Sequence, residues 1–163
     1  MANPIARFFA HRLLERPAAR IGAEGLVERL EAGRAPLAAL ALAAEDASGR
    51  KQLRHVIAIE RWGQNRLRVA LGDLPYERDA SGAYAPPEDE PLASLVERFE
   101  AVRAETVELG RRVAAAEAGA TVVAPAVATT VEHNSLGPIS ARAWLRYLQV
   151  HGELEMKRAK PRR

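Results

Sequence analysis

Two residues near the end of the chain have the type and the spacing to bind one metal ion. In the stretch LRYLQVHGELEMKR, residues 145–158, His151 and Glu155 stand four positions apart. If this stretch is helical, both side chains lie on one face, where an imidazole and a carboxylate can bind the same cation. Trp144 and Leu148 continue the same stripe. Because these two side chains are apolar, we expect the stripe to face the protein core or its mouth.

A third ligand has to come from another part of the chain. The sequence has no cysteine and four histidines, so His, Asp and Glu are the strong ligands available. His55 is the first candidate, because it follows Ser48, a residue typical of a helix N-cap, by seven positions. A simpler alternative stays open: His151 is a hydrogen-bonded core residue, and Glu155 pairs with an arginine at the end of its helix.

Four long segments with helical periodicity would have to position these ligands. They cover residues 22–44, 51–71 and 92–119, and a final helix of about 17 residues after the N-cap Ser140. A shorter amphipathic helix is expected over 4–15, ended by the Arg-Pro pair that follows it.

Proline and glycine predict where the helices are interrupted. Gly33 and Pro36 should kink or split the second segment. Residues 45–50 are expected to form a loop, and residues 72–91 a long irregular connection rich in proline. The β-branched segment 120–138 fits either two brief strands or an extended loop.

These segments predict an all-α fold, an up-down four-helix bundle in a single domain over residues 1–163. Residues 1–21 would be an N-terminal extension that carries the short extra helix. Residues 157–163 would be a basic tail. The aromatic pair Phe8 and Phe9 on the extra N-terminal helix has apolar surface that a homodimer would bury.

The hydropathy and charge patterns limit the partners that we expect for this protein. No uncharged apolar run of 18 residues occurs, so we expect a cytoplasmic protein without a membrane span. The net charge is only +3, and 21 acidic residues are spread among the basic ones. Nucleic-acid binding is not expected, because a basic footprint would gather on one face. The basic tail is read as a solvated helix end.

Three pieces of the sequence resemble the DinB-like superfamily of four-helix proteins, also called YfiT-like or damage-inducible: SGRKQLRH, IERWGQNRL and HNSLGPISARAWLRYLQVHGELE. The resemblance implies a metal site in which His55 matches the histidine of the second helix. His151 matches the first histidine of the terminal pair, and Glu155 stands where the family has the second. Ala47 is another departure, because the family usually has Trp before the capping Ser.

The resemblance implies a metal-dependent enzyme, a thiol S-transferase or a hydrolase. Its cofactor would be zinc, nickel, manganese or iron(II), and its substrate a low-molecular-weight thiol or another small molecule. His133 and the 72–91 connection would shape the substrate pocket. The alternative is a non-catalytic, stress-related dimeric helical protein that has lost the metal, because Glu155 replaces the usual histidine.

Overall fold

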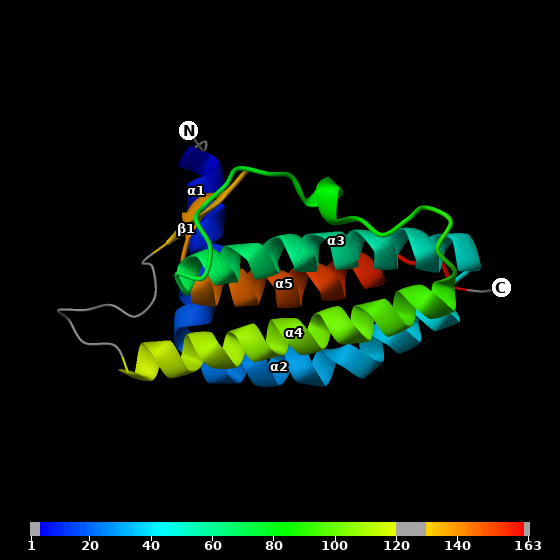
Figure 1. The fold of residues 1–163 in the computed structure, drawn as a ribbon, viewed down its shortest axis with the longest axis horizontal. Coiled ribbons are helices and arrows are strands. Elements are labelled where there is room, and N and C mark those ends of the chain that lie inside the picture. Colours follow the sequence, from blue (N-terminus) through cyan, green and yellow to red (C-terminus); the bar gives the residue numbers. More distant parts are fainter. Residues whose placement is uncertain (1–3, 120–129, 162–163) are drawn as a thin grey trace.

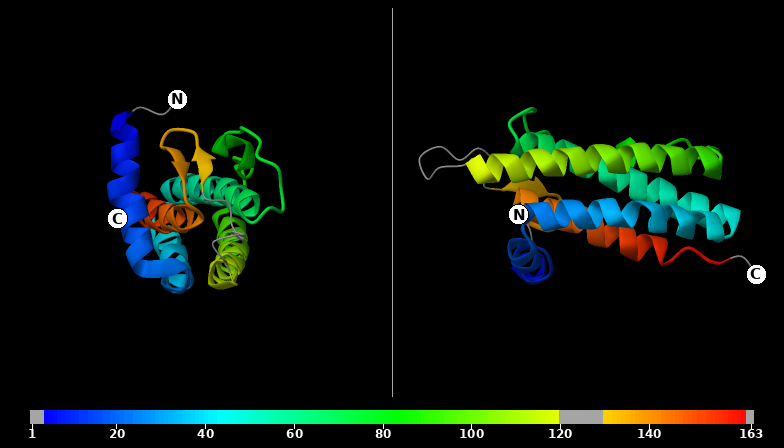
Figure 2. Two further views of the ribbon diagram at one scale, coloured as in Figure 1. Left: turned by 90° about the vertical axis from the view of Figure 1, so that its left-hand side faces the viewer. Right: turned by 90° about the horizontal axis from the view of Figure 1, so that it is seen from below.

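Four long helices make up most of the molecule. The computed structural model describes residues 4–119 and 130–161. The long helices are α2 (Arg16–Ala43), α3 (Asp46–Ala70), α4 (Leu92–Gly119) and α5 (Ala141–Met156). They pack side by side, and α3 lies against both α4 and α5 (Figures 1 and 2). The predicted helical character is confirmed, and no helix in the described ranges has the length and apolar character needed to cross a membrane.

The connection between α3 and α4 returns along α3, so these two helices run in the same direction (Figure 1). Near the C-terminal end of α3, Trp62 Nε1 donates to Asp79 Oδ1 over 2.8 Å. Farther back on the helix, Arg54 Nη2 donates to the carbonyl of Pro86 over 2.9 Å. A strictly alternating up-down order is therefore wrong, because the irregular connection is long enough to span the helix and is bonded along it.

The shorter elements lie at the end of the helices where α5 begins. They are α1 (Pro4–Ala10), the π-turn η1 (His11–Glu15) and the strands β1 (Val131–His133) and β2 (Gly137–Ile139). A further short element, the 3₁₀ turn η2 (Ser81–Tyr84), lies part-way along α3 in the α3–α4 connection (Figure 1). β1 and β2 pair antiparallel. Two brief strands are thus the correct alternative for residues 130–139, whereas residues 120–129 lie outside the described part of the chain.

The N-terminal helical run ends at a glycine. α1, η1 and the start of α2 form one helical stretch, and the backbone leaves helical geometry at Gly22, which has a φ of 78°. The predicted end at Pro17 is wrong, because the π-turn changes the hydrogen-bond register directly before this proline, where a missing N–H is tolerated. Of the two predicted effects of Gly33 and Pro36, a split of the helix does not occur: the helix continues past both, with Pro36 on its exposed side.

The beginning of the basic tail, which follows α5, is hydrogen-bonded to the start of α3. α3 begins at Asp46, so the predicted loop over residues 45–50 is wrong, and Ser48 lies inside the first turn. The Ser48 hydroxyl accepts a hydrogen bond from the Lys160 N–H over 2.8 Å and does not cap α3. The N–H of Glu45 donates to the Lys160 carbonyl over 2.8 Å. The tail therefore bonds the Glu45 N–H and the Ser48 hydroxyl, two groups that local capping rules expect to act within α3.

The N-cap of α5 is confirmed. The Ser140 hydroxyl accepts a hydrogen bond from the N–H of Ala143 over 3.1 Å. The same serine is held by the N-terminal run, because the Glu15 carboxylate accepts from the Ser140 N–H over 2.7 Å and from its hydroxyl over 2.8 Å. The start of α5 is thereby bonded to the end of η1.

A buried ion pair joins α3 and α4 inside the core. Glu60 on α3 and Arg103 on α4 are each only 1% exposed. Arg103 Nε lies 2.7 Å from Glu60 Oε1, and Arg103 Nη2 donates to Oε2 over 2.9 Å. One hydrogen bond and one close ion-pair contact thus join the two charges, which neutralise one another in the core. The pair therefore fixes how α3 and α4 align.

Arg103→Met is expected to lower the free energy of unfolding by about 3–5 kcal/mol, because it leaves Glu60 charged and unpaired in the core. The double variant Glu60→Met/Arg103→Met should recover most of this loss, since neither charge remains. Urea unfolding followed by circular dichroism measures both values. If the double variant is no more stable than the single one, the destabilisation does not come from the unpaired charge.

Candidate metal centre

Two antiparallel helices bring the three predicted ligands together. His55 comes from the first half of α3, and His151 and Glu155 come from the second half of α5. One ligand atom from each residue lies within 4.8 Å of the others. The rings of His55 and His151 have centroids 5.0 Å apart and planes inclined by 54°. Residues distant in the sequence thus form one group that can hold a metal ion.

A close contact between α3 and α5 sets the separation of the ligands. A Cβ atom built on Gly63 would lie 2.6 Å from Leu148 Cδ2, so only glycine leaves room for this side chain. On the same side of the helix pair, the rings of Trp62 and Trp144 pack edge to face with centroids 5.0 Å apart. Both tryptophans are buried, as expected for core residues.

The cluster lies at the edge of the helix contact and not deep in the core. His55 is exposed, whereas His151 and Glu155 are half-buried. The apolar stripe is confirmed for Trp144 and Leu148, which are buried. Farther along the stripe, His151 and Glu155 are only partly covered. An ion bound here would be reachable from the surface.

Electrostatics keep His151 in the neutral form. Burial first and the nearby His55 second lower the pKa of His151, the carboxylate of Glu155 acts in the opposite direction, and the resulting pKa is about 4. A neutral imidazole has the free lone pair that a metal requires. His151 therefore does not have to lose a proton at neutral pH before it can bind an ion.

Glu155 already has a cationic partner. Arg158 Nη1 lies 2.5 Å from Glu155 Oε1, so the pairing with an arginine left open by the sequence is present in the structure. The Arg158 side chain is 68% exposed. The Glu155 side chain is 13% exposed. The arginine can therefore return to solvent when a divalent cation takes its place beside the carboxylate.

The three residues fit a divalent ion of the zinc type. Zinc binds imidazole nitrogen and carboxylate oxygen at about 2.0–2.2 Å, which puts tetrahedral ligand atoms about 3.4 Å from one another. The ligand atoms here lie within 4.8 Å of one another, so small side-chain rotations would bring them to that spacing. Two nitrogens and one oxygen also suit nickel, manganese and iron(II). Three protein ligands leave a position open for a substrate or water.

His133 lies beside this cluster and is not part of it. It ends β1, is buried, and has its ring centroid 4.8 Å from that of Tyr147. The His133 Nδ1 accepts from the N–H groups of Ser135 and Leu136, both over 3.2 Å, so the ring proton is on Nε2. Burial, with the charge of Arg66 next, lowers the His133 pKa to about 4. His133 is thus a neutral residue held by its own turn.

Tyr147 is the member of the site that the sequence pattern missed. It stands four residues before His151, and the two ring centroids are 5.4 Å apart. Burial, together with the negative charge of Glu155, raises the Tyr147 pKa to about 12. Its hydroxyl therefore keeps its proton at neutral pH. The helical spacing to His151 could have identified it, but the ring reads equally well as a core residue.

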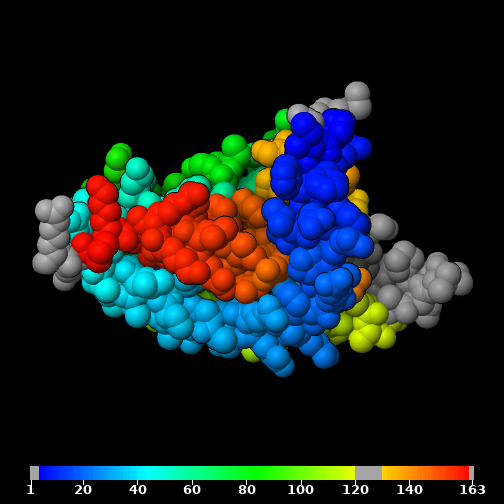
Figure 3. All heavy atoms as spheres, turned by 180° about the vertical axis from the view of Figure 1, so that it is seen from behind, coloured from blue at the N-terminus to red at the C-terminus, as the bar shows by residue number. Residues whose placement is uncertain are grey.

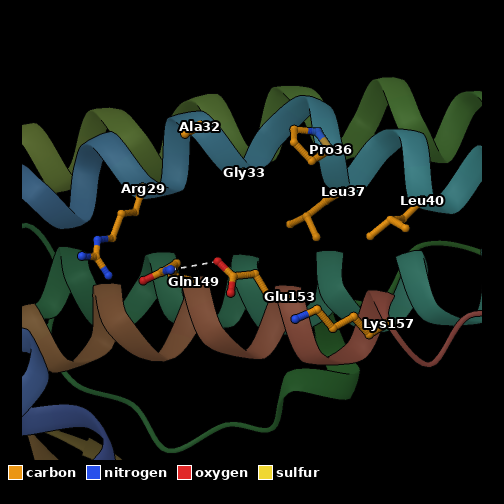
Figure 4. Close-up of a pocket in the computed structure, with 9 residues that line it drawn as sticks. All are labelled: Arg29, Ala32, Gly33, Pro36, Leu37, Leu40, Gln149, Glu153 and Lys157. Carbon is orange, nitrogen blue, oxygen red and sulfur yellow. Dashed lines mark hydrogen bonds between the residues drawn. The ribbon is translucent and has the colours of Figure 1, made fainter.

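Two hollows adjoin α5 on different faces. One, with a volume of about 450 Å³, lies between α2 and α5, and its wall includes Arg29, Leu37, Gln149 and Glu153 (Figure 4). The other, of about 400 Å³, lies between α5 and the N-terminal helical run, and His151 and Tyr147 line it. Only the second of these adjoins the ligand cluster. The α3–α4 connection contributes no residue to its wall.

Comparisons with known proteins reveal no relative of this chain. No protein-family model matches it, and neither a curated protein nor a solved structure does.

Gly63→Ala is expected to lower the free energy of unfolding, because the new Cβ collides with Leu148. Better helix propensity would add about 1 kcal/mol, but overpacking a core costs about 1–3 kcal/mol. The same change should weaken zinc binding by pushing α3 away from α5. Urea unfolding and calorimetric zinc titration measure the two effects.

The matched control is Gly33→Ala on α2, where the new Cβ would meet nothing closer than Arg103 Nη1 at 3.9 Å. This variant should be as stable as the parent or more so. A stability gain in Gly63→Ala equal to that of the control would contradict the tight contact.

Proposed function

We propose that the protein is a DinB-like four-helix protein that binds one divalent ion through His55, His151 and Glu155. The observation that carries this proposal is the convergence of these ligand atoms, from α3 and α5, to within 4.8 Å. The DinB-like pieces of the sequence support it, because they contain all three residues. The neutral state of His151 and the solvent-accessible His55 favour uptake of an ion from solution.

The reaction we propose is metal-dependent transfer of a low-molecular-weight thiol to an electrophile, or a hydrolysis. A bound divalent ion supplies Lewis acidity, which lowers the pKa of a thiol or water. The chain itself supplies the hollow beside His151, whose largely apolar wall would hold the apolar part of a substrate. Tyr147 would hold its hydroxyl proton beside the site and donate a hydrogen bond to the substrate.

Zinc, nickel or manganese added to chelator-treated protein is expected to bind at about one ion per chain. His55→Ala, His151→Ala and Glu155→Ala should each weaken binding by more than about tenfold, because each removes one of three ligands. Isothermal titration calorimetry gives the affinity, and elemental analysis of the desalted protein gives the stoichiometry.

His11→Ala is the control, because His11 is exposed and lies on the N-terminal run. It should leave affinity and stoichiometry unchanged. Unaltered metal content in both His55→Ala and His151→Ala would exclude this centre.

Zinc-loaded protein is expected to accelerate the reaction of glutathione with monochlorobimane, in which the thiol loses its proton, sulfur bonds to carbon and chloride leaves. The rate should fall to the uncatalysed level after chelation and in His151→Ala. Fluorescence of the bimane product measures the rate. Equal rates with and without metal would remove the transferase and leave the hydrolase to be tested with ester substrates.

The alternative function is that of a non-catalytic, stress-related helical dimer. The ion pair between Glu155 and Arg158 favours it, since it satisfies the carboxylate without a metal. Absence of binding at micromolar ion would support this alternative. In either case we propose a homodimer through the outer face of α1, where Phe8 is 60% exposed and packs edge to face on Phe9.

A further inference from the structure

The hollow between the N-terminal helical run and α5 has an apolar wall. In the space-filling view the N-terminal run crosses α5 near its start (Figure 3). The hollow between them has a volume of about 400 Å³, within the range of small-molecule sites. Its apolar side chains include Phe9, Leu13 and Leu14 from the N-terminal run and Val150 and Leu154 from α5. A ligand here must bring an apolar body.

Hydrogen bonds and buried side chains hold both walls of this hollow in place, so it is not a gap beside a loosely attached helix. The two bonds from Ser140 to the Glu15 carboxylate hold the end of η1 against the start of α5. Ala10 and Leu14, on the inner side of the run, are buried. The two walls of the hollow therefore keep a defined distance.

One wall residue carries a charge that the described chain leaves unpaired. Arg146 lines the hollow, and its Nη1 donates to Gln149 Oε1 over 2.7 Å. Gln149 in turn donates to Glu153 over 2.8 Å, the bond drawn in Figure 4. A neutral amide thus orients the guanidinium. Among the described residues no carboxylate lies within ion-pair distance of Arg146, and its buried Nε has no hydrogen-bond partner.

Other arginines in this protein show what Arg146 lacks. Arg103 is paired with Glu60, and the buried Arg66 is paired with Asp79. Exposed Arg112 has both oxygens of Asp73. In each pair a carboxylate accepts at least one hydrogen bond from the guanidinium. The free donors of Arg146 therefore point to a carboxylate that the chain does not provide.

We propose that this hollow binds a small monocarboxylate with an apolar body. Its carboxylate would accept from Arg146, and its body would lie along Phe9 and Leu13, next to His151. A single carboxylate balances the one charged side chain of the described wall, whereas a phosphate dianion would bring a second charge into apolar surroundings at high cost. Binding of this molecule by the hollow does not depend on the metal centre. The proposal rests on the proposed function only where it makes this molecule the substrate of that centre.

The test is calorimetric titration of 4-phenylbutyrate and of its uncharged counterpart 4-phenylbutan-1-ol into the full chain, with chelator and with zinc. In the chelated protein the acid should bind about tenfold more tightly than the alcohol. Arg146→Gln should abolish this difference, and Arg146→Lys should keep part of it. The control Arg142→Gln, one turn earlier on α5, should bind the acid as the parent does, because Arg142 pairs with Glu117.

Leu13→Ser should weaken the acid and the alcohol alike. Equal affinity for the two compounds, or an unchanged affinity for the acid in Arg146→Gln, would overturn the proposal. Binding of the acid only in the zinc-loaded protein would also overturn it, because the carboxylate would then be taken by the metal. If the acid binds through Arg146 in a protein that takes up no metal, the carboxylate site in the hollow is supported and the metal centre is rejected.

Discussion

The close approach of α3 and α5 at Gly63 and Leu148 is the constraint on which the candidate site depends. The two helices are antiparallel, so His55, which precedes Gly63, and His151, which follows Leu148, lie on the same side of this contact. A larger residue at position 63 would separate the helices, and with them the imidazoles. Each ligand residue is fixed to its own helix by the backbone. The distance between the two helices, and so between the ligands, depends on the packing of the Leu148 side chain against Gly63, which has no side chain.

The charged groups of the core are paired within the chain, whereas those at the candidate site are left accessible. The buried Glu60 and Arg103 pair with one another, and the buried Arg66 pairs with the partly exposed Asp79, because an unpaired buried charge is costly. At the surface end of α5 the opposite holds. Glu155 is paired only with an exposed arginine, and Arg146 is held by a neutral amide. These two groups, on either side of His151, are the ones that an external cation and an external carboxylate can engage without breaking a core interaction.

Local signals in the sequence predicted some elements closely, and long-range contacts overrode others. The bounds of α4 and the Ser140 cap follow from periodicity and capping chemistry within the segments themselves. Ser48 failed as a cap because Lys160, far away in the sequence, takes its hydroxyl. The ligand trio was found from i and i+4 spacing together with a family resemblance. The exposure of His55, the hollow and the role of Arg146 were not, because they depend on how the N-terminal run crosses α5, and no spacing rule encodes that crossing.

The position of a bound ion tests the central claim most directly. A crystal of the zinc-loaded protein, with diffraction collected at the zinc absorption edge, gives that position from the anomalous difference map without any assumption about the ligands. Convergence of α3 and α5 on one cation predicts a peak enclosed by the side chains of His55, His151 and Glu155. A peak at His11 or His133, or no peak at the α3–α5 contact in protein that carries zinc, would contradict it.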